Sequence, residues 1–88
     1  MPWTYRFTET ALKEFTKLNR QVQTEVIRYL DDRIATPESP ERFGKPLRGD
    51  KWGSWRYRIG DYRLVCKIER SALIVLVLHV GHRSRIYD

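Results

Sequence analysis

Two short turns in the second half of the chain constrain its fold more than any other feature. Gly60 and Asp61 separate two segments, 54–59 and 62–69, in which apolar and polar residues alternate. A third segment, 72–80, is almost entirely apolar and follows after another short turn. Connections this short join antiparallel strands, because a parallel crossover needs a dozen or more residues. The sequence therefore predicts an antiparallel meander in which 72–80 is a central strand covered on both faces.

The first half predicts a short strand followed by two helices. Residues 3–7 alternate apolar and polar, and Thr8 offers a hydroxyl that can cap a helix. Asn19 is placed to end that helix and to cap a second one, whose apolar stripe runs to about Ala35. Four breakers between residues 36 and 46 exclude regular structure there. We therefore expect an α+β fold with a short N-terminal strand and a helical hairpin packed on an antiparallel sheet.

Length and composition limit the chain to one domain, 1–88, without disulfides. Cys66 is the only cysteine, and its apolar neighbours predict a buried, inert thiol in a reducing compartment. The chain shows neither a targeting segment nor an apolar run near the ~20 residues that a membrane span requires. It also shows no phosphate-binding loop or metal-ligand spacing. We expect a cytoplasmic protein with no cofactor, no metal and no contact with a membrane.

The positive charge is concentrated in the second half of the chain. Residues 45–88 carry ten Lys or Arg against four Asp or Glu, whereas residues 1–44 carry seven of each. Aromatic residues lie between these arginines, although Trp52 and Trp55 are better suited to the core or its edge. Clustered cations with interleaved aromatics are typical of proteins that bind single-stranded RNA. An acidic protein partner could use the same surface.

Several of these arginines are expected on one face of the sheet. Strand periodicity places Arg56 and Arg58 opposite the apolar face formed by Tyr57 and its neighbours. If Gly60 and Asp61 form a two-residue hairpin loop, Arg58 lies directly across from Arg63. Like charges opposite one another are destabilising. Such a conflict is expected where an anion is bound.

The tail after Gly81 delivers His82, Arg83 and Tyr87 to one end of the sheet. Metal-free RNA cleavage requires attack by the 2′-hydroxyl, neutralisation of the transition state and protonation of the leaving 5′-oxygen. Arginine serves the second need, but its pKa keeps it protonated. His82 and Tyr87 are therefore the better proton carriers, while His79 is better explained as a structural histidine.

Several stretches in order along the chain resemble the RelE toxins of bacterial toxin–antitoxin pairs. These stretches are Ala11-Leu12-Lys13-Glu14-Phe15, Pro46-Leu47-Arg48-Gly49, Gly60-Asp61-Tyr62-Arg63-Leu64-Val65, and Val80-Gly81-His82-Arg83 with Tyr87. The resemblance implies a metal-independent endoribonuclease that cuts messenger RNA in the ribosomal A site and so stops translation. It also implies a RelB-like antitoxin as partner, contact with 16S rRNA, and binding of operator DNA only through the antitoxin complex.

The resemblance also implies roles for individual residues. Arg63 matches the arginine that stabilises the transition state, Arg83 the one proposed to protonate the leaving group, and Tyr87 the tyrosine proposed to activate the 2′-hydroxyl. His82 could transfer a proton, as histidines do in some relatives. The residues expected to bind RNA are Arg48, Lys51, Arg56, Arg58 and Arg85.

Two other functions remain open at this point. The first is that of a ParE-type toxin, which shares the fold but inhibits DNA gyrase and cleaves no RNA. The second is that of a noncatalytic module whose basic face contacts operator DNA or only its antitoxin. The complete set of arginines with Tyr87 favours the nuclease.

Overall fold

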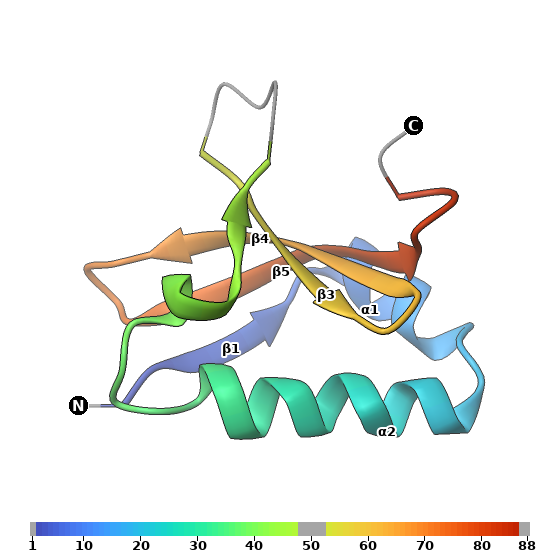
Figure 1. Cartoon of the computed structure of the whole chain (residues 1–88), viewed down its shortest axis with the longest axis horizontal. Helices are drawn as coiled ribbons and strands as arrows, with labels where there is room; N and C mark the ends of the chain where they lie inside the picture. The colour runs from blue at the N-terminus through green and yellow to red at the C-terminus, as the bar shows by residue number, and fades with distance from the viewer. Residues whose placement is uncertain (1, 48–52, 87–88) are drawn as a thin grey trace.

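A computed structural model describes residues 2–47 and 53–86, and in it five strands form one mixed sheet (Figure 1). The strands are β1 (Thr4–Phe7), β2 (Lys45–Pro46), β3 (Trp55–Ile59), β4 (Tyr62–Glu69) and β5 (Ile74–His82), in the order β1-β5-β4-β3-β2. β1 runs parallel to β5, and the other neighbours are antiparallel. The α+β class is confirmed. The antiparallel meander predicted for the second half is confirmed in β3, β4 and β5. No partner was predicted for the N-terminal strand β1, which adds to β5 in parallel because the chain between them forms helices and other strands.

Both helices begin where the sequence predicts. Thr8 caps α1 (Glu9–Thr16) and Asn19 caps α2 (Arg20–Tyr29), each by accepting a backbone N–H with its side chain. α2 continues as a π-helical turn, η1 (Leu30–Ile34), which accounts for the predicted extent of the second helix. None of the helices in the described part of the chain is long and apolar enough to cross a bilayer.

The segment 36–46 is more ordered than its breakers predict. It holds a 3-10 helix, η2 (Pro40–Phe43), and the two residues of β2. Pro40 occupies the first turn of η2, where its missing N–H costs nothing, and the Ser39 side chain caps that turn. The prediction that this segment lacks regular structure is therefore wrong.

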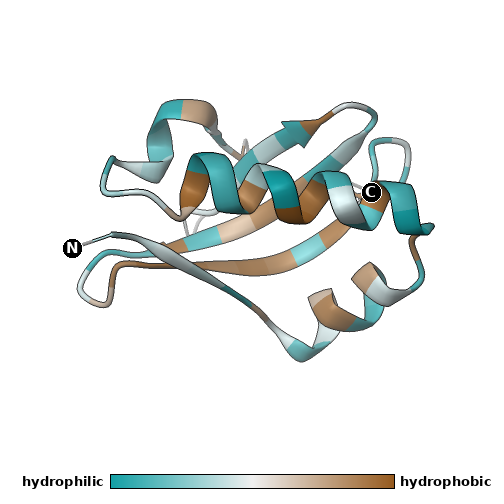
Figure 2. Cartoon of the chain, turned by 90° about the horizontal axis from the view of Figure 1, so that it is seen from below, coloured by the Kyte–Doolittle hydropathy of each residue, from teal (hydrophilic) through white to brown (hydrophobic). Residues whose placement is uncertain are grey.

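One core joins the helices to one face of the sheet. Its fully buried members come from α1, α2, η1 and the strands, and they include Ala11, Val26, Leu30, Ile34, Tyr57, Leu64, Cys66, Val75 and Val77. Figure 2 shows that β5 is hydrophobic along most of its length. Only one face of β5 is buried, however, because Ile74, Leu76 and Leu78 are only partly buried. The expectation that both faces of this strand are covered is therefore wrong for the described residues.

Cys66 is fully buried, as the sequence predicts for an inert thiol. Burial raises the pKa of the thiol, which keeps it protonated and therefore unreactive.

The β3–β4 hairpin has the predicted register. Ile59 pairs with Tyr62 and Arg58 with Arg63. β5 ends later than predicted: it does not stop at Gly81, because Tyr62 pairs with His82 and the Arg83 N–H donates to the Asp61 carbonyl over 2.8 Å. The tail therefore begins at Arg83.

Replacing Tyr57 by phenylalanine tests how the core holds η2 against the sheet. The buried Tyr57 hydroxyl donates to the Pro40 carbonyl over 2.8 Å, and burial raises the pKa of Tyr57. Tyr57→Phe removes this buried hydrogen bond, so we expect the free energy of unfolding to fall by about 0.5–1.5 kcal/mol in urea titrations. Tyr62→Phe is the matched control, because no described residue bonds to the Tyr62 hydroxyl. An equal loss of stability in both variants would contradict this role of Tyr57.

Candidate functional site

The strands place a group of cations on the sheet surface that faces away from the helices. We call Arg56, Arg58 and Arg63 the arginine face; alternation along β3 and β4 puts them opposite the buried Tyr57 and Leu64. Arg56 is partly buried and Arg58 is exposed, and neither side chain forms an ion pair or hydrogen bond with any other described residue. Their charges are therefore available to an anion.

Lys45 adds a cation to the arginine face that the sequence did not predict. It pairs with Arg56 across the β2–β3 ladder, which places both residues at the same level of the sheet. No pattern in the sequence indicates this neighbour, because the two residues of β2 lie among breakers. Without an expected strand, Lys45 had no predicted partner.

Arg63 is held below the surface. It is 6% exposed, and its Nη1 donates to the Gly60 carbonyl over 2.8 Å and to the Tyr62 carbonyl over 2.9 Å. Gly60 lies in the β3–β4 turn and Tyr62 is the first residue of β4, so the guanidinium stabilises the turn end of the hairpin. On the β5 side Arg63 pairs with Gly81, which has no side chain to crowd it. A fixed positive charge therefore lies beside Arg58.

Arg83 lies at the same end of the hairpin. In addition to its backbone hydrogen bond, its Nε is 3.9 Å from Asp61 Oδ1. Both side chains are well exposed, so this ion pair is weak and exchanges with solvent. The hairpin end thus carries Arg63, and Arg83 is bound to the turn residue Asp61.

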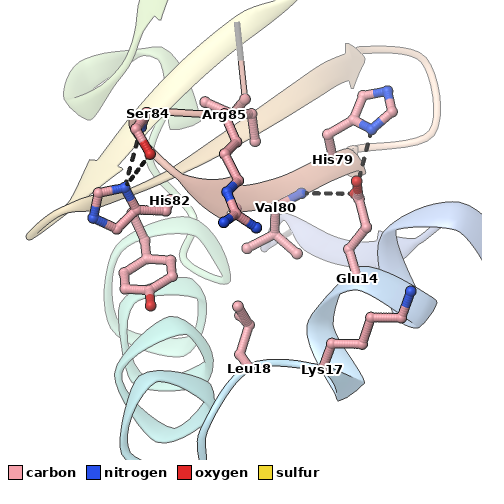
Figure 3. Close-up of a pocket in the computed structure, with 11 residues that line it drawn as sticks. Glu14, Lys17, Leu18, His79, Val80, His82, Ser84 and Arg85 are labelled. Carbon is pink, nitrogen blue, oxygen red and sulfur yellow. Dashed lines mark hydrogen bonds and ion pairs between the residues drawn. The ribbon is translucent and has the colours of Figure 1, made fainter. Parts of the chain in front are cut away.

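A groove of about 850 Å³ lies between the end of α1, the end of β5 and the tail (Figure 3). Lys17, Tyr62, His82 and Arg85 contribute to its lining. Figure 3 shows Arg85 between His82 on one side and Glu14 with His79 on the other. His82 and Arg85 therefore line a surface other than the arginine face, and the structure divides the predicted site residues between the two.

Glu14 binds the backbone of β5 beyond the point where the pairing with β1 ends. Its Oε1 accepts the Val80 N–H over 3.1 Å and lies 3.3 Å from His79 Nδ1. His79 is thus hydrogen-bonded to the fold, which agrees with its interpretation as a structural histidine, and its side chain is 51% exposed.

The remaining predicted residues lie outside the described part of the chain. These are Arg48, Lys51 and Tyr87, together with Trp52. Within 2–47 and 53–86, no group of three or more His, Cys, Asp or Glu side chains is arranged to hold a metal ion. Trp55, by contrast, is described, and it packs against the core as predicted.

Comparison with known proteins places these features in a family. Residues 5–87 match the family of ParE toxins of type II toxin–antitoxin systems. The chain is 37% identical over 87 residues to Toxin RelG of Mycobacterium tuberculosis, covering 99% of this chain and 98% of that protein. It is 30% identical over 86 residues to Toxin RelE of the same organism, covering 98% and 87%.

Solved structures of toxins share the fold. The toxin–antitoxin complex RelBE2 of M. tuberculosis matches with a TM-score of 0.83 at 35% identity, covering 94% of this chain and 100% of that chain. The isolated RelE toxin of Escherichia coli matches with a TM-score of 0.72 at 26% identity, covering 97% and 88%. The chain therefore belongs to the ParE toxin family, as a toxin of the RelE/ParE superfamily from a toxin–antitoxin system.

Proposed function

We propose that this toxin is a ribosome-dependent mRNA interferase, an endoribonuclease that cuts messenger RNA in the A site. The observation that carries the proposal is the pairing of Arg58 with Arg63, two arginines directly opposite one another in the β3–β4 register, with Arg56 two residues before Arg58 on the same face. No described acid neutralises Arg56 or Arg58, and like charges in this arrangement destabilise the sheet. A bound phosphodiester would offset that repulsion.

The proposed reaction needs only charge stabilisation and two proton transfers. The 2′-oxygen forms a bond to phosphorus, the bond from phosphorus to the 5′-oxygen breaks, and a cyclic phosphate remains. The 2′-hydroxyl loses its proton to a base, and the leaving 5′-oxygen gains one. Arg63 would stabilise the additional negative charge of the transition state, since its guanidinium is held in place before the substrate binds.

The same proposal gives further residues a role in contacting the RNA. Arg83 would act at the leaving oxygen and Tyr87 at the 2′-hydroxyl, as in RelE toxins. Because a guanidinium group stays protonated, charge stabilisation is the main contribution expected from Arg83. Phosphates along the RNA would be bound by Arg48, Lys51, Arg56, Arg58 and Arg85.

An antitoxin is the expected partner outside the ribosome. Solved neighbours include complexes of RelE with RelB. The partly buried Ile74 and Leu76 pair with Glu69 and Lys67 and lie on the same side of the sheet as the arginine face. A segment with both acidic and apolar residues would cover the two areas together. We propose that such a RelB-like antitoxin inhibits the toxin in the cytoplasm, and that operator DNA is contacted only through that complex.

Inhibition of DNA gyrase is the second candidate, and the match to the ParE toxins favours it. The two functions predict different products. An interferase produces new ends within translated messenger RNA, whereas a gyrase inhibitor produces gyrase-dependent breaks in DNA.

A paired assay separates the two functions. The toxin is incubated with translating ribosomes and messenger RNA, and RNA ends are mapped by primer extension; in parallel it is incubated with gyrase and supercoiled DNA. We expect ribosome-dependent cuts inside the reading frame and intact DNA. DNA breaks without RNA cuts would replace the proposal by the gyrase function.

A further inference from the structure

We infer that His82 is a positioning residue that holds the C-terminal tail, and that it carries no proton in the reaction. The kinetic test of this inference rests on the proposed function. The spectroscopic test needs only the free toxin. Its basis is a set of hydrogen bonds that occupies one ring nitrogen of His82 and closes the tail into a turn.

The hydrogen bonds of His82 determine which of its nitrogens carries hydrogen. Nδ1 accepts the backbone N–H of Ser84 over 3.1 Å and lies 2.9 Å from the Ser84 hydroxyl oxygen. A backbone N–H can only donate, so Nδ1 must present its lone pair. The hydrogen of the neutral ring is therefore on Nε2. The only basic nitrogen of the neutral ring is engaged by Ser84, and using it as a base would break the turn.

The ring also lies on the wrong side of the sheet for the scissile phosphate proposed above. His82 pairs with Tyr62, and the residues two positions along these strands, Leu64 and Val80, face the core. Alternation therefore places the His82 ring on the helix side, where it contacts the Tyr62 ring edge-on at 5.5 Å between centroids. Arg63, in contrast, belongs to the arginine face on the other side.

The same turn decides where Arg83 lies. The Arg85 N–H donates to the His82 carbonyl over 2.9 Å, and the Arg83 N–H is bound to Asp61. Between these two anchors the His82 ring holds Ser84. Ile86 then folds back towards Gly81, where its Cδ1 would lie 3.7 Å from a Cβ added to that glycine. Loss of the ring acceptor would free Ser84 and leave the segment 83–86 held by the two backbone hydrogen bonds alone, so Arg83 and Arg85 would be placed less precisely.

A spectroscopic test uses the whole toxin without ribosomes. The chain has only two histidines, so the imidazole ¹⁵N signals can be assigned with one substitution, His79→Gln. We expect His82 to show a lone-pair nitrogen at Nδ1 and a hydrogen-bearing nitrogen at Nε2. His79 is expected to show the reverse, because its Nδ1 faces the Glu14 carboxylate, which can only accept. A hydrogen on Nδ1 of neutral His82 would overturn the inference, whatever the toxin does to RNA.

The kinetic test compares His82→Asn, His82→Gln and His82→Phe in the ribosome assay. Asparagine places an amide oxygen where Nδ1 was, so it can still accept the Ser84 N–H, whereas glutamine places its amide near Nε2. Phenylalanine keeps the ring without the acceptor. We expect His82→Asn to stay within about threefold of the parental kcat and to keep the parental pH profile. His82→Phe and His82→Gln should lose about 100-fold in kcat with little change in KM, as expected for misplaced groups.

The outcomes distinguish this inference from the proposed function. If the parental toxin cuts no RNA, the proposed function fails while the tautomer test still stands. If the parental toxin cuts and His82→Asn is inactive while His82→Gln is active, His82 acts through Nε2 and the inference is wrong. Loss of one limb of the pH profile in His82→Asn would also overturn it, because that limb would belong to His82 itself.

Discussion

Cutting of messenger RNA on the ribosome is expected to fall about 100- to 1000-fold when Arg56 and Arg58 are both replaced by glutamine. These two side chains form no ion pair with any described residue, so their replacement removes charge from the proposed phosphate site without breaking an existing interaction. Binding to ribosomes should also depend less steeply on salt, by about one unit of slope for each phosphate that is no longer bound. Single-turnover rates and binding at several salt concentrations measure both effects.

Stability should change in the opposite direction in the same variant. Removing the charge of Arg58 relieves its opposition to Arg63, so the free energy of unfolding should stay constant or rise by about 0.2–1 kcal/mol. A matched control replaces Arg20 and Arg28, two exposed residues of α2, by glutamine. It lowers the net charge by the same amount. If this control loses as much cutting as the double variant, net charge and not the arginine face drives the reaction.

The sequence predicts best those features that depend on neighbouring residues. A two-residue turn leaves one register for the β3–β4 hairpin, and the opposition of Arg58 and Arg63 follows directly from it. Thr8 and Asn19 cap their helices through bonds to backbone groups three residues away. These interactions are local, so composition and spacing determine them.

Features that depend on distant parts of the chain could not be predicted in this way. β1 pairs with β5 across nearly the whole chain, and Lys45 pairs with Arg56 across the segment between β2 and β3. Periodicity places Arg58 and Arg63 on one face, but it cannot say which of them is buried. Arg63 lies in β4, between β3 and β5, whereas β2 pairs only with Trp55 and Arg56 and leaves Arg58 open.

Burial of Arg63 gives its substitution two separable effects. Arg63→Ala removes the charged donor shared by the Gly60 and Tyr62 carbonyls, so we expect the free energy of unfolding to fall by about 1.5–3 kcal/mol. We also expect cutting to fall below detection, since the variant loses the fixed positive charge. Urea titration gives the first quantity. Cleavage at a temperature where near-ultraviolet circular dichroism shows a folded protein gives the second.

Arg63→Lys separates the effect of the positive charge from the effect of the two hydrogen bonds that the guanidinium donates. Lysine keeps a positive charge and can donate to the turn, so most of the stability should return. Its ammonium is a point charge on a flexible stem and does not reproduce a planar guanidinium fixed by two carbonyls, so cutting should remain at least about tenfold below the parental rate. Parental cutting by folded Arg63→Ala would show that the buried charge is needed only for the turn. The transition state would then have to be stabilised by Arg58 and Arg83 at the open end of the hairpin.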